Sequence, residues 1–234
     1  MSSIYKDLSE AACSGKKLLS VLIDPDKFDE RSAGIFFLNL PESVTHIFVG
    51  GSRVELNKTQ TTVQEIKART NLPLILFPGD HSQITESADA ILFLSLISGR
   101  NPEFLIEQQV KSVSQLRNSK LEIIPTGYIL IEGGNKSAVQ SVSNTKPIPQ
   151  NDVETIVNTA LAGQFSGKKL IYLEAGSGAE VSVSEEIISA VKEAINIPLI
   201  VGGGIRSKQQ LRRSYEAGAD MVVIGTAFEN GKVF

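Results

Sequence analysis

Eight short apolar runs, spaced along the whole chain of 234 residues, constrain its fold more than any other feature. The segments between them carry apolar residues three and four positions apart, as in EEIISAVKEAI at 185–195, which is typical of amphipathic helices. Continuous apolar runs are typical of parallel strands buried on both faces. Eight such runs alternating with helices predict an α/β fold, a (β/α)8 TIM barrel, with residues 1–234 forming a single domain. The runs span residues 17–25, 45–52, 72–80, 89–99, 121–130, 169–177, 197–204 and 220–227.

Two segments depart from the regular barrel pattern. HSQITESA at 81–88 is too short and too polar for a full helix, so we expect the third helix to be missing or replaced by a short segment. FENGKVF at 228–234 leaves almost no room for a last helix, so we expect a truncated final helix. A doubly wound open sheet is the alternative architecture.

Composition excludes several classes of protein. The net charge of −3, with acidic and basic residues interspersed, gives no broad positive surface, so we expect no nucleic-acid partner. Cys13 is the single cysteine and cannot form an internal disulfide, which fits a cytoplasmic location. Apolar runs such as residues 90–97 are far shorter than the roughly 20 residues of a membrane-spanning helix. We expect at most peripheral membrane contact.

Glycine turns close the seventh and eighth runs. Gly202, Gly203 and Gly204 end the seventh, and Gly225 and Thr226 end the eighth. Backbone N–H groups in such turns approach an anion closely, and in TIM barrels the loops after strands 7 and 8 commonly bind phosphate. We therefore predict a phosphate site there, in preference to turns that bind nothing. The absence of a GxxxxGK[ST] motif argues against a nucleotide P-loop.

A single carboxylate, Glu174, closes the sixth run, and Ser177 and Gly178 follow in the next turn. A carboxylate at a strand end can accept hydrogen bonds from two alcohols or take a proton from one. Since the phosphate site is adjacent, we predict that Glu174 binds a polyol carrying that phosphate. The alternative is a structural ion pair with a lysine or arginine at the barrel mouth.

The first, second and fifth runs end in further candidate groups. Asp24 and Ser52 are predicted to hold Mg²⁺ together with substrate phosphates, although an N-cap aspartate and a turn serine are the simpler interpretations. The fifth run ends in Tyr128, Ile129 and Leu130, an apolar edge that suits a hydrocarbon substrate or packs under a neighbouring loop or subunit.

Taken together, these strand ends resemble the geranylgeranylglyceryl phosphate synthase family, which includes bacterial relatives that make heptaprenylglyceryl phosphate. The resemblance covers nearly the whole chain, and YLEAGSG is its most specific motif. SLISGRNPE and the short third connection look like the second of the family's two groups. The matching stretches are IDPDK at 23–27, FVGGS at 48–52, FPGD at 77–80, SLISGRNPE at 95–103, PTGYIL at 125–130, YLEAGSG at 172–178, VGGGIRS at 201–207 and IGTAFE at 224–229.

The resemblance implies a prenyltransferase that joins geranylgeranyl diphosphate to sn-glycerol 1-phosphate, forming the first ether bond of archaeal-type lipids. Heptaprenyl or another chain length is the alternative. The resemblance also implies that Mg²⁺ binds at Asp24 and Ser52. It places glycerol phosphate at Tyr172, Leu173, Glu174, Ala175, Gly176, Ser177, Gly178, Gly203, Gly204, Gly225 and Thr226.

The mechanism that follows is a hypothesis. Lys27 and Arg100 help Mg²⁺ stabilise the leaving diphosphate, Tyr128 lines the prenyl groove, and Glu174 positions or deprotonates the attacking hydroxyl. Two other readings are a phosphosugar isomerase or aldolase and a non-catalytic phosphometabolite-binding barrel. Missing outer helices would leave apolar surface, so we expect a homo-oligomer.

Overall fold

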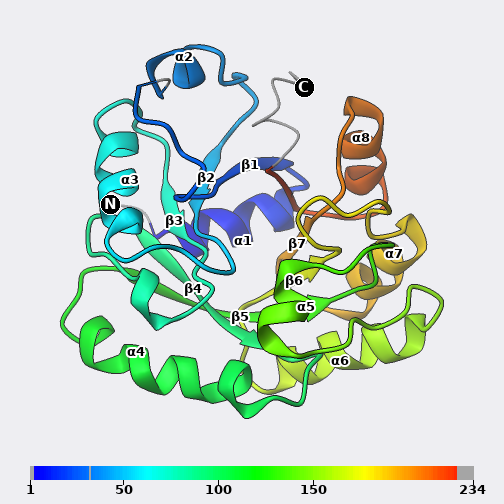
Figure 1. The fold of residues 1–234 in the computed structure, drawn as a ribbon. Coiled ribbons are helices and arrows are strands. Elements are labelled where there is room, and N and C mark those ends of the chain that lie inside the picture. The colour runs from blue at the N-terminus through cyan, green and yellow to red at the C-terminus, as the bar shows by residue number, and fades with distance from the viewer. Residues whose placement is uncertain (1–2, 32, 226–234) are drawn as a thin grey trace.

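The computed structural model describes residues 3–31 and 33–225, and these form a closed barrel of eight parallel strands in chain order. Figure 1 shows the strands at the centre, with α3, α4, α6, α7 and α8 around them. The predicted (β/α)8 architecture is confirmed, and the open doubly wound sheet is excluded by the pairing of the first strand with the eighth. The strands are β1 Leu18–Ile23, β2 His46–Val49, β3 Leu74–Leu76, β4 Ala90–Leu96, β5 Glu122–Leu130, β6 Leu170–Glu174, β7 Leu199–Gly202 and β8 Met221–Ile224.

The helices follow the strands in the expected alternation, except between β3 and β4. That connection contains only the 3-10 turn η1, which confirms the predicted loss of the third helix. The truncated final helix was predicted for residues that lie outside the described part of the chain. The helices are α1 Ile4–Ser14, α2 Ala33–Leu38, α3 Lys58–Lys67, η1 His81–Gln83, the π-helical turn η2 Glu103–Glu107, α4 Gln108–Leu116, α5 Ala138–Ser143, α6 Val153–Phe165, α7 Glu185–Ala194 and α8 Lys208–Glu216.

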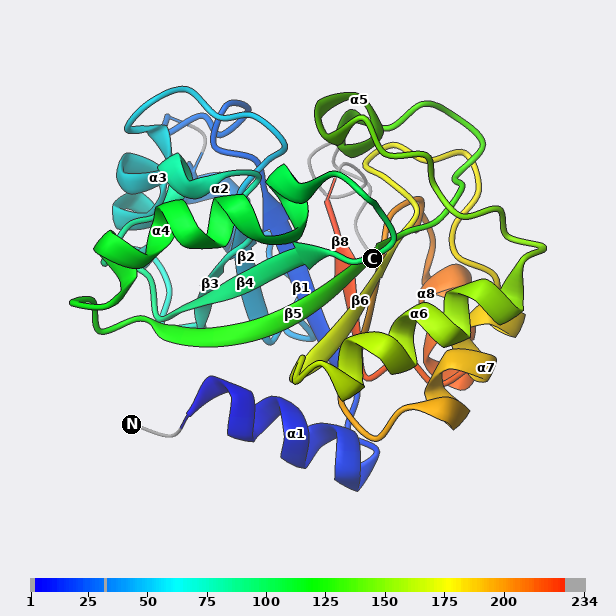
Figure 2. The same ribbon diagram turned by 90° about the horizontal axis from the view of Figure 1, so that it is seen from below.

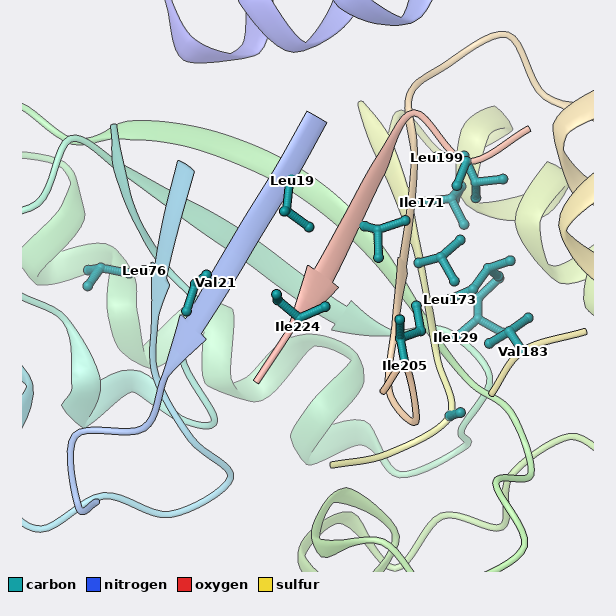
Figure 3. Packing of buried hydrophobic residues seen from close by; sticks show 14 of the residues in the cluster. Leu19, Val21, Leu76, Ile129, Ile171, Leu173, Val183, Leu199, Ile205 and Ile224 are labelled. Atoms are coloured by element: carbon teal, nitrogen blue, oxygen red, sulfur yellow. The ribbon is translucent and has the colours of Figure 1, made fainter. Parts of the chain in front are cut away.

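Two apolar layers explain why the strand sequences are continuous apolar runs. In β6, Leu170 and Tyr172 belong to the cluster inside the barrel, whereas Ile171 and Leu173 belong to the cluster between strands and helices. Figure 3 shows part of this outer cluster. Because successive side chains of a strand point to opposite faces, both faces of each strand must be apolar.

Helix α1 covers the end of the barrel at which the strands begin, as Figure 2 shows. Its buried residues Ile4 and Leu8 pack into the inner cluster. The Glu122 carboxylate, at the start of β5, accepts hydrogen bonds from the backbone N–H groups of Ile4 at 2.6 Å and Tyr5 at 3.0 Å. These are N–H groups that the helix itself leaves unpaired. Because α1 covers the end where the strands begin, access to the interior of the described barrel is from the opposite end, where the parallel strands finish.

Two lysine–aspartate pairs secure equivalent places in the two halves of the barrel. Asp220, before β8, accepts hydrogen bonds from the Leu199 N–H at 2.8 Å and from the Lys192 ammonium at 2.7 Å. Asp89, before β4, similarly pairs with Lys67 and with the N–H that begins β3. Each pair ties the helix that precedes one strand to the residue immediately before the next strand.

We expect Asp220→Ala to lower the free energy of unfolding by about 3 kcal/mol, because it leaves a strand N–H and a partly buried ammonium without their acceptor. Asp29→Ala is the control, since its ion pair with Arg31 lies on the surface and such pairs contribute little. Urea unfolding measures both variants. Equal losses would contradict the structural role of Asp220, and turnover of the folded Asp220 variant should be unchanged.

Candidate active site

A cavity of about 860 Å³ opens at the carboxyl ends of the strands, which is the end where barrel enzymes place their reacting groups. Most of the predicted site residues meet there, although they come from six different strands or the loops after them. Those that line the cavity are Asp24, Lys27, Ser52, Tyr128, Tyr172, Glu174, Ser177, Gly178, Gly203, Gly204 and Gly225.

Other predicted site residues do not reach the cavity. The side chains of Leu173 and Ala175 belong to the outer apolar cluster, because strand alternation turns them away from the side that Tyr172 and Glu174 face. Gly176 has no side chain and takes part only through its backbone. Arg100 lines a separate surface hollow, where its guanidinium donates to the Gly99 carbonyl at 2.7 Å, so the structure does not bring it to the cavity in which the leaving diphosphate was predicted to lie. Thr226 lies outside the described residues.

Glu174 is the chemically distinctive group of the cavity. Its side chain is 6% exposed, and one carboxylate oxygen accepts a hydrogen bond from the Gly176 N–H at 2.7 Å. Burial raises the pKa of Glu174 to about 7, against the opposing effects of the Gly176 amide and the Tyr172 hydroxyl. Within residues 3–31 and 33–225 it makes no ion pair, so no described lysine or arginine forms the structural salt bridge that was the alternative. A buried carboxylate that titrates near neutral pH suits proton transfer.

The Tyr172 hydroxyl lies beside this carboxylate but completes no well-formed hydrogen bond within residues 3–31 and 33–225. Burial, with the Glu174 charge as a smaller contribution, raises the pKa of the hydroxyls of Tyr172 and Tyr128. Both tyrosines therefore stay neutral. An unpaired buried O–H costs stability, which is typical of a group whose partner is a ligand.

The turn after β7 packs directly against the glutamate. Gly203 has φ +85°, and a Cβ atom there would lie 2.5 Å from Glu174 Oε1 and 2.7 Å from the Gly176 nitrogen. Only glycine accommodates both the conformation and the close approach. Arg206 secures the neighbouring loop by donating to the carbonyls of Ala179 at 2.6 Å and Gly178 at 3.1 Å. The predicted phosphate loops after β6 and β7 thus form one backbone surface.

The opposite rim of the cavity carries the groups predicted to bind metal and diphosphate. The Asp24 carboxylate accepts from the Asp26 N–H at 3.0 Å and lies 3.3 Å from the Lys27 ammonium. The chain at Gly51, just before Ser52, runs against it, since a Cβ on Gly51 would lie 3.2 Å from Asp24 Oδ1. No cluster of three or more His, Cys, Asp or Glu side chains exists among the residues described. This set fits Mg²⁺, which binds through one or two carboxylates, waters and substrate phosphates.

An apolar arm of the cavity runs between β4 and α4, beside the place where the helix between β3 and β4 is missing. Its residues include Ile84, Ile91, Phe93, Gln109 and Ser112. Tyr128 also lines the cavity, whereas Ile129 and Leu130 are buried in the core and do not. Only the first of the three apolar residues that end the fifth run therefore faces the cavity.

Sequence reasoning did not identify two further cavity residues, Phe77 and Arg53. Arg53 follows Ser52, lines the cavity and makes no ion pair with a described residue. Phe77 begins the FPGD stretch after the third run, and its ring stacks on Tyr172 across the barrel. Phe77 directly follows β3 and Arg53 lies in the loop after β2, and a place in the segment that follows a strand is the signal that could have found both.

Comparison with known proteins decides the family. The model of the PcrB family matches residues 16–233. The chain belongs to the PcrB family. PcrB family relatives named geranylgeranylglyceryl phosphate synthase include one from Zunongwangia profunda, 61% identical over 99% of both chains. Another, from Pyrococcus abyssi, is 45% identical over 96% of this chain and 89% of its own. The resemblance stated from the sequence is confirmed.

Solved structures agree with the PcrB assignment. The crystal structure of (S)-3-O-geranylgeranylglyceryl phosphate synthase from Thermoplasma acidophilum, in complex with its substrate sn-glycerol 1-phosphate, superposes with a TM-score of 0.90. It is 35% identical and is matched over 98% of this chain and 92% of its own. Within residues 3–31 and 33–225 of the PcrB chain, no helix is both long and apolar enough to cross a bilayer.

Proposed function

We propose that this protein is a prenyltransferase that joins geranylgeranyl diphosphate to sn-glycerol 1-phosphate and releases diphosphate. The observation that carries the proposal is Glu174, a buried carboxylate that makes no ion pair with a described residue and shares one cavity with a glycine-rich backbone surface and an apolar arm. The relatives' names and the glycerol phosphate bound by the Thermoplasma acidophilum enzyme support the choice of substrates.

In the proposed reaction, the backbone around Gly203, Gly204 and Gly225 holds the glycerol phosphate, and the Glu174 carboxylate accepts a hydrogen bond from a glycerol hydroxyl. The allylic C–O bond of the prenyl diphosphate breaks and diphosphate leaves. The glycerol oxygen then bonds to the allylic carbon, and its proton passes to Glu174. The cations of Lys27 and Arg53 line the cavity where the leaving group would lie and offset its charge.

We propose Mg²⁺ as the cofactor, held by Asp24 and Ser52 together with the diphosphate. When bound, it supplies Lewis-acid stabilisation of the leaving group. Asp24 contributes a carboxylate already oriented by the Asp26 N–H, and Lys27 limits the local negative charge in the metal's absence.

We expect Asp24→Asn to raise the Mg²⁺ concentration for half-maximal activity at least tenfold, since even outer-shell partners of metal sites are commonly worth 10–100-fold. Asp26→Asn is the matched control, because its carboxylate pairs with Lys58 and does not line the cavity. A Mg²⁺ titration of turnover measures both. An unchanged Mg²⁺ requirement in Asp24→Asn, in a variant that still turns over, would remove Asp24 from the metal site.

Geranylgeranyl is the proposed chain because the relatives carry that name, and heptaprenyl is the alternative within the same reaction. We also propose that residues 1–234 act as one cytoplasmic domain and that the protein self-associates. Ile106, Val110 and Val113, on η2 and α4, are each about half exposed and form an apolar stripe that a second copy would cover. Light scattering tests that association.

The test of function is an end-point assay with Mg²⁺, sn-glycerol 1-phosphate and a series of prenyl diphosphates. We expect a prenylglyceryl phosphate from the 1-phosphate and not from sn-glycerol 3-phosphate. The second candidate, a phosphometabolite-binding protein, rests on the same glycine-rich backbone. Glycerol phosphate binding without product from any donor would favour it and overturn the proposed prenyltransferase.

A further inference from the structure

Three aromatic rings from separate strands meet in the cavity. Phe77, after β3, stacks on Tyr172 of β6 with ring centroids 5.1 Å apart and an interplanar angle of 16°. Tyr128 of β5 contacts both, with centroids at 5.9 Å from Phe77 and 5.4 Å from Tyr172. All three residues line the cavity. We call this trio the aromatic floor.

The aromatic floor lies between the two groups that the proposed reaction must bring together. Asp24 and the Gly51–Arg53 segment follow β1 and β2, whereas Glu174 ends β6; on one side of the closed barrel β3, β4 and β5 separate β2 from β6. Phe77 reaches across this interval to the ring of Tyr172, which is two residues before Glu174. An allylic carbon positioned between a diphosphate at one rim and a hydroxyl on Glu174 must therefore pass close to these rings.

The electrostatics of the floor are specific. The face of an aromatic ring is the negative end of its quadrupole and attracts a cation within about 6 Å of the centroid. Tyr128 and Tyr172 are nearly or fully buried, so little water competes with that attraction. Their hydroxyls stay neutral, because burial and the Glu174 charge both raise the pKa. The floor thus attracts positive charge without supplying an anion that would capture it.

We infer that Phe77, Tyr128 and Tyr172 form a cation–π surface that stabilises the positive charge developing on the allylic carbon as diphosphate leaves. This rests on the proposed prenyl transfer and deepens it by giving these rings a part in the chemical step. The charge is shared between the prenyl carbons and vanishes when the glycerol oxygen bonds. The rings gain and lose no atoms.

The competing explanation is that the three rings only pack, forming an apolar bed for the hydrocarbon. Packing depends on ring size and shape, whereas the cation–π attraction depends on electron density. Fluorine substitution strongly lowers the electron density of the ring face but changes the size of the ring little. It therefore distinguishes a cation–π role from packing alone. Phe48 is a matched control: it is buried against Phe77 with centroids 6.1 Å apart, but it does not line the cavity.

The experiment incorporates mono-, di- and trifluorophenylalanine at position 77, and separately at position 48, in the full chain. The single-turnover rate of prenyl transfer is measured with saturating prenyl diphosphate, together with the KM for that substrate. We expect the rate to fall progressively, by about tenfold at trifluorophenylalanine-77, with little change in KM. The position-48 series should be flat.

A flat rate series at position 77, an equal slope at position 48, or an effect confined to KM would overturn the inference while leaving the proposed function intact. Absence of product from the unmodified protein would overturn the proposed function and this inference with it. Phe77→Leu adds a check, because it removes the ring but keeps an apolar side chain. It should slow the step at least as much as trifluorination, and a normal rate in the folded variant would contradict the inference.

Discussion

Glu174→Gln is expected to lower kcat for prenyl transfer by roughly a thousandfold, within the range typical of lost general-base catalysis. The amide keeps the size of the side chain and can still accept the hydrogen bond from the Gly176 N–H, but it cannot take the proton of the attacking hydroxyl. The measurement is kcat under saturating substrates. Glu180→Gln, on an exposed part of the following loop, is the control and should keep normal turnover. Full activity in Glu174→Gln would end the proposed role of the carboxylate.

The same substitution should also stabilise the protein, by an amount that grows as the pH rises above 4.5 and levels off above about 7. The pKa of Glu174 is about 7 in the folded protein and near its ordinary value of 4.5 in the unfolded chain. The folded state therefore holds the proton more tightly. Stability is fully present below pH 4.5 and is lost as the pH rises towards 7 and above. The gap between the two pKa values corresponds to about 3 kcal/mol.

Urea unfolding at two pH values tests this second effect. At pH 8 the Gln variant should exceed the unmodified protein in free energy of unfolding by up to about 3 kcal/mol, whereas at about pH 4 the two should nearly agree. A gain of equal size at both pH values would show that the carboxylate's charge is not the cause. The activity of the unmodified free enzyme should also rise with pH through about 7.

Gly203→Ala is expected to reduce kcat/KM for glycerol phosphate by at least about a hundredfold, the scale that a 1 Å misplacement of reacting groups can cost. The added Cβ would lie 2.5 Å from Glu174 Oε1 and 2.8 Å from the Gly176 carbonyl oxygen, so the carboxylate and the turn must both move. Backbone strain adds to this because φ is +85°.

Gly178→Ala is the control that separates the backbone strain of a positive φ from the steric clash of an added Cβ with Glu174. Gly178 has a similar φ of +73° and lines the same cavity, but a Cβ there would meet no atom within 4 Å. It should therefore lose stability at the level of strain alone, about 1–2 kcal/mol, and keep most of its kcat. Steady-state kinetics and thermal unfolding of the two variants make the comparison. Equal kinetic losses would mean that the close approach at Gly203 does not matter.

The sequence was sufficient for the fold because parallel strands buried on both faces leave a strong local signal, and eight of them with short connections have few other arrangements. Glu174 was identified from the same strand pattern, because a carboxylate at the end of a buried strand is costly and is typical of a functional group at the mouth of a barrel. The side chains of Leu173 and Ala175 face away from the cavity, as alternation along a strand already predicts, so only their backbone groups could contact a ligand there.

The other differences between the predicted site and the structure arise from contacts between residues that are far apart in the sequence, or from where the chain leaves the barrel mouth. Arg100 follows the fourth apolar run, but β4 ends at Leu96 and the chain has left the barrel mouth by Gly99. The stacking of Phe77 on Tyr172 joins residues almost a hundred positions apart. The binding of the start of α1 by Glu122 spans a similar separation. Such pairs form only when the barrel closes, so the residues next to each partner in the sequence do not predict them.

The missing helix between β3 and β4 has a further consequence for this molecule. In a regular barrel a helix would pack over β4 at this place. Here the apolar arm of the cavity lies beside η1 and α4, and under the proposed function the prenyl chain of the substrate would pack there instead. A bound hydrocarbon tail then acts as a temporary part of the protein's interior. Each additional carbon that fits would strengthen the fold as well as the complex, by mass action. The lipid being built would then take the place of the helix that is missing between β3 and β4.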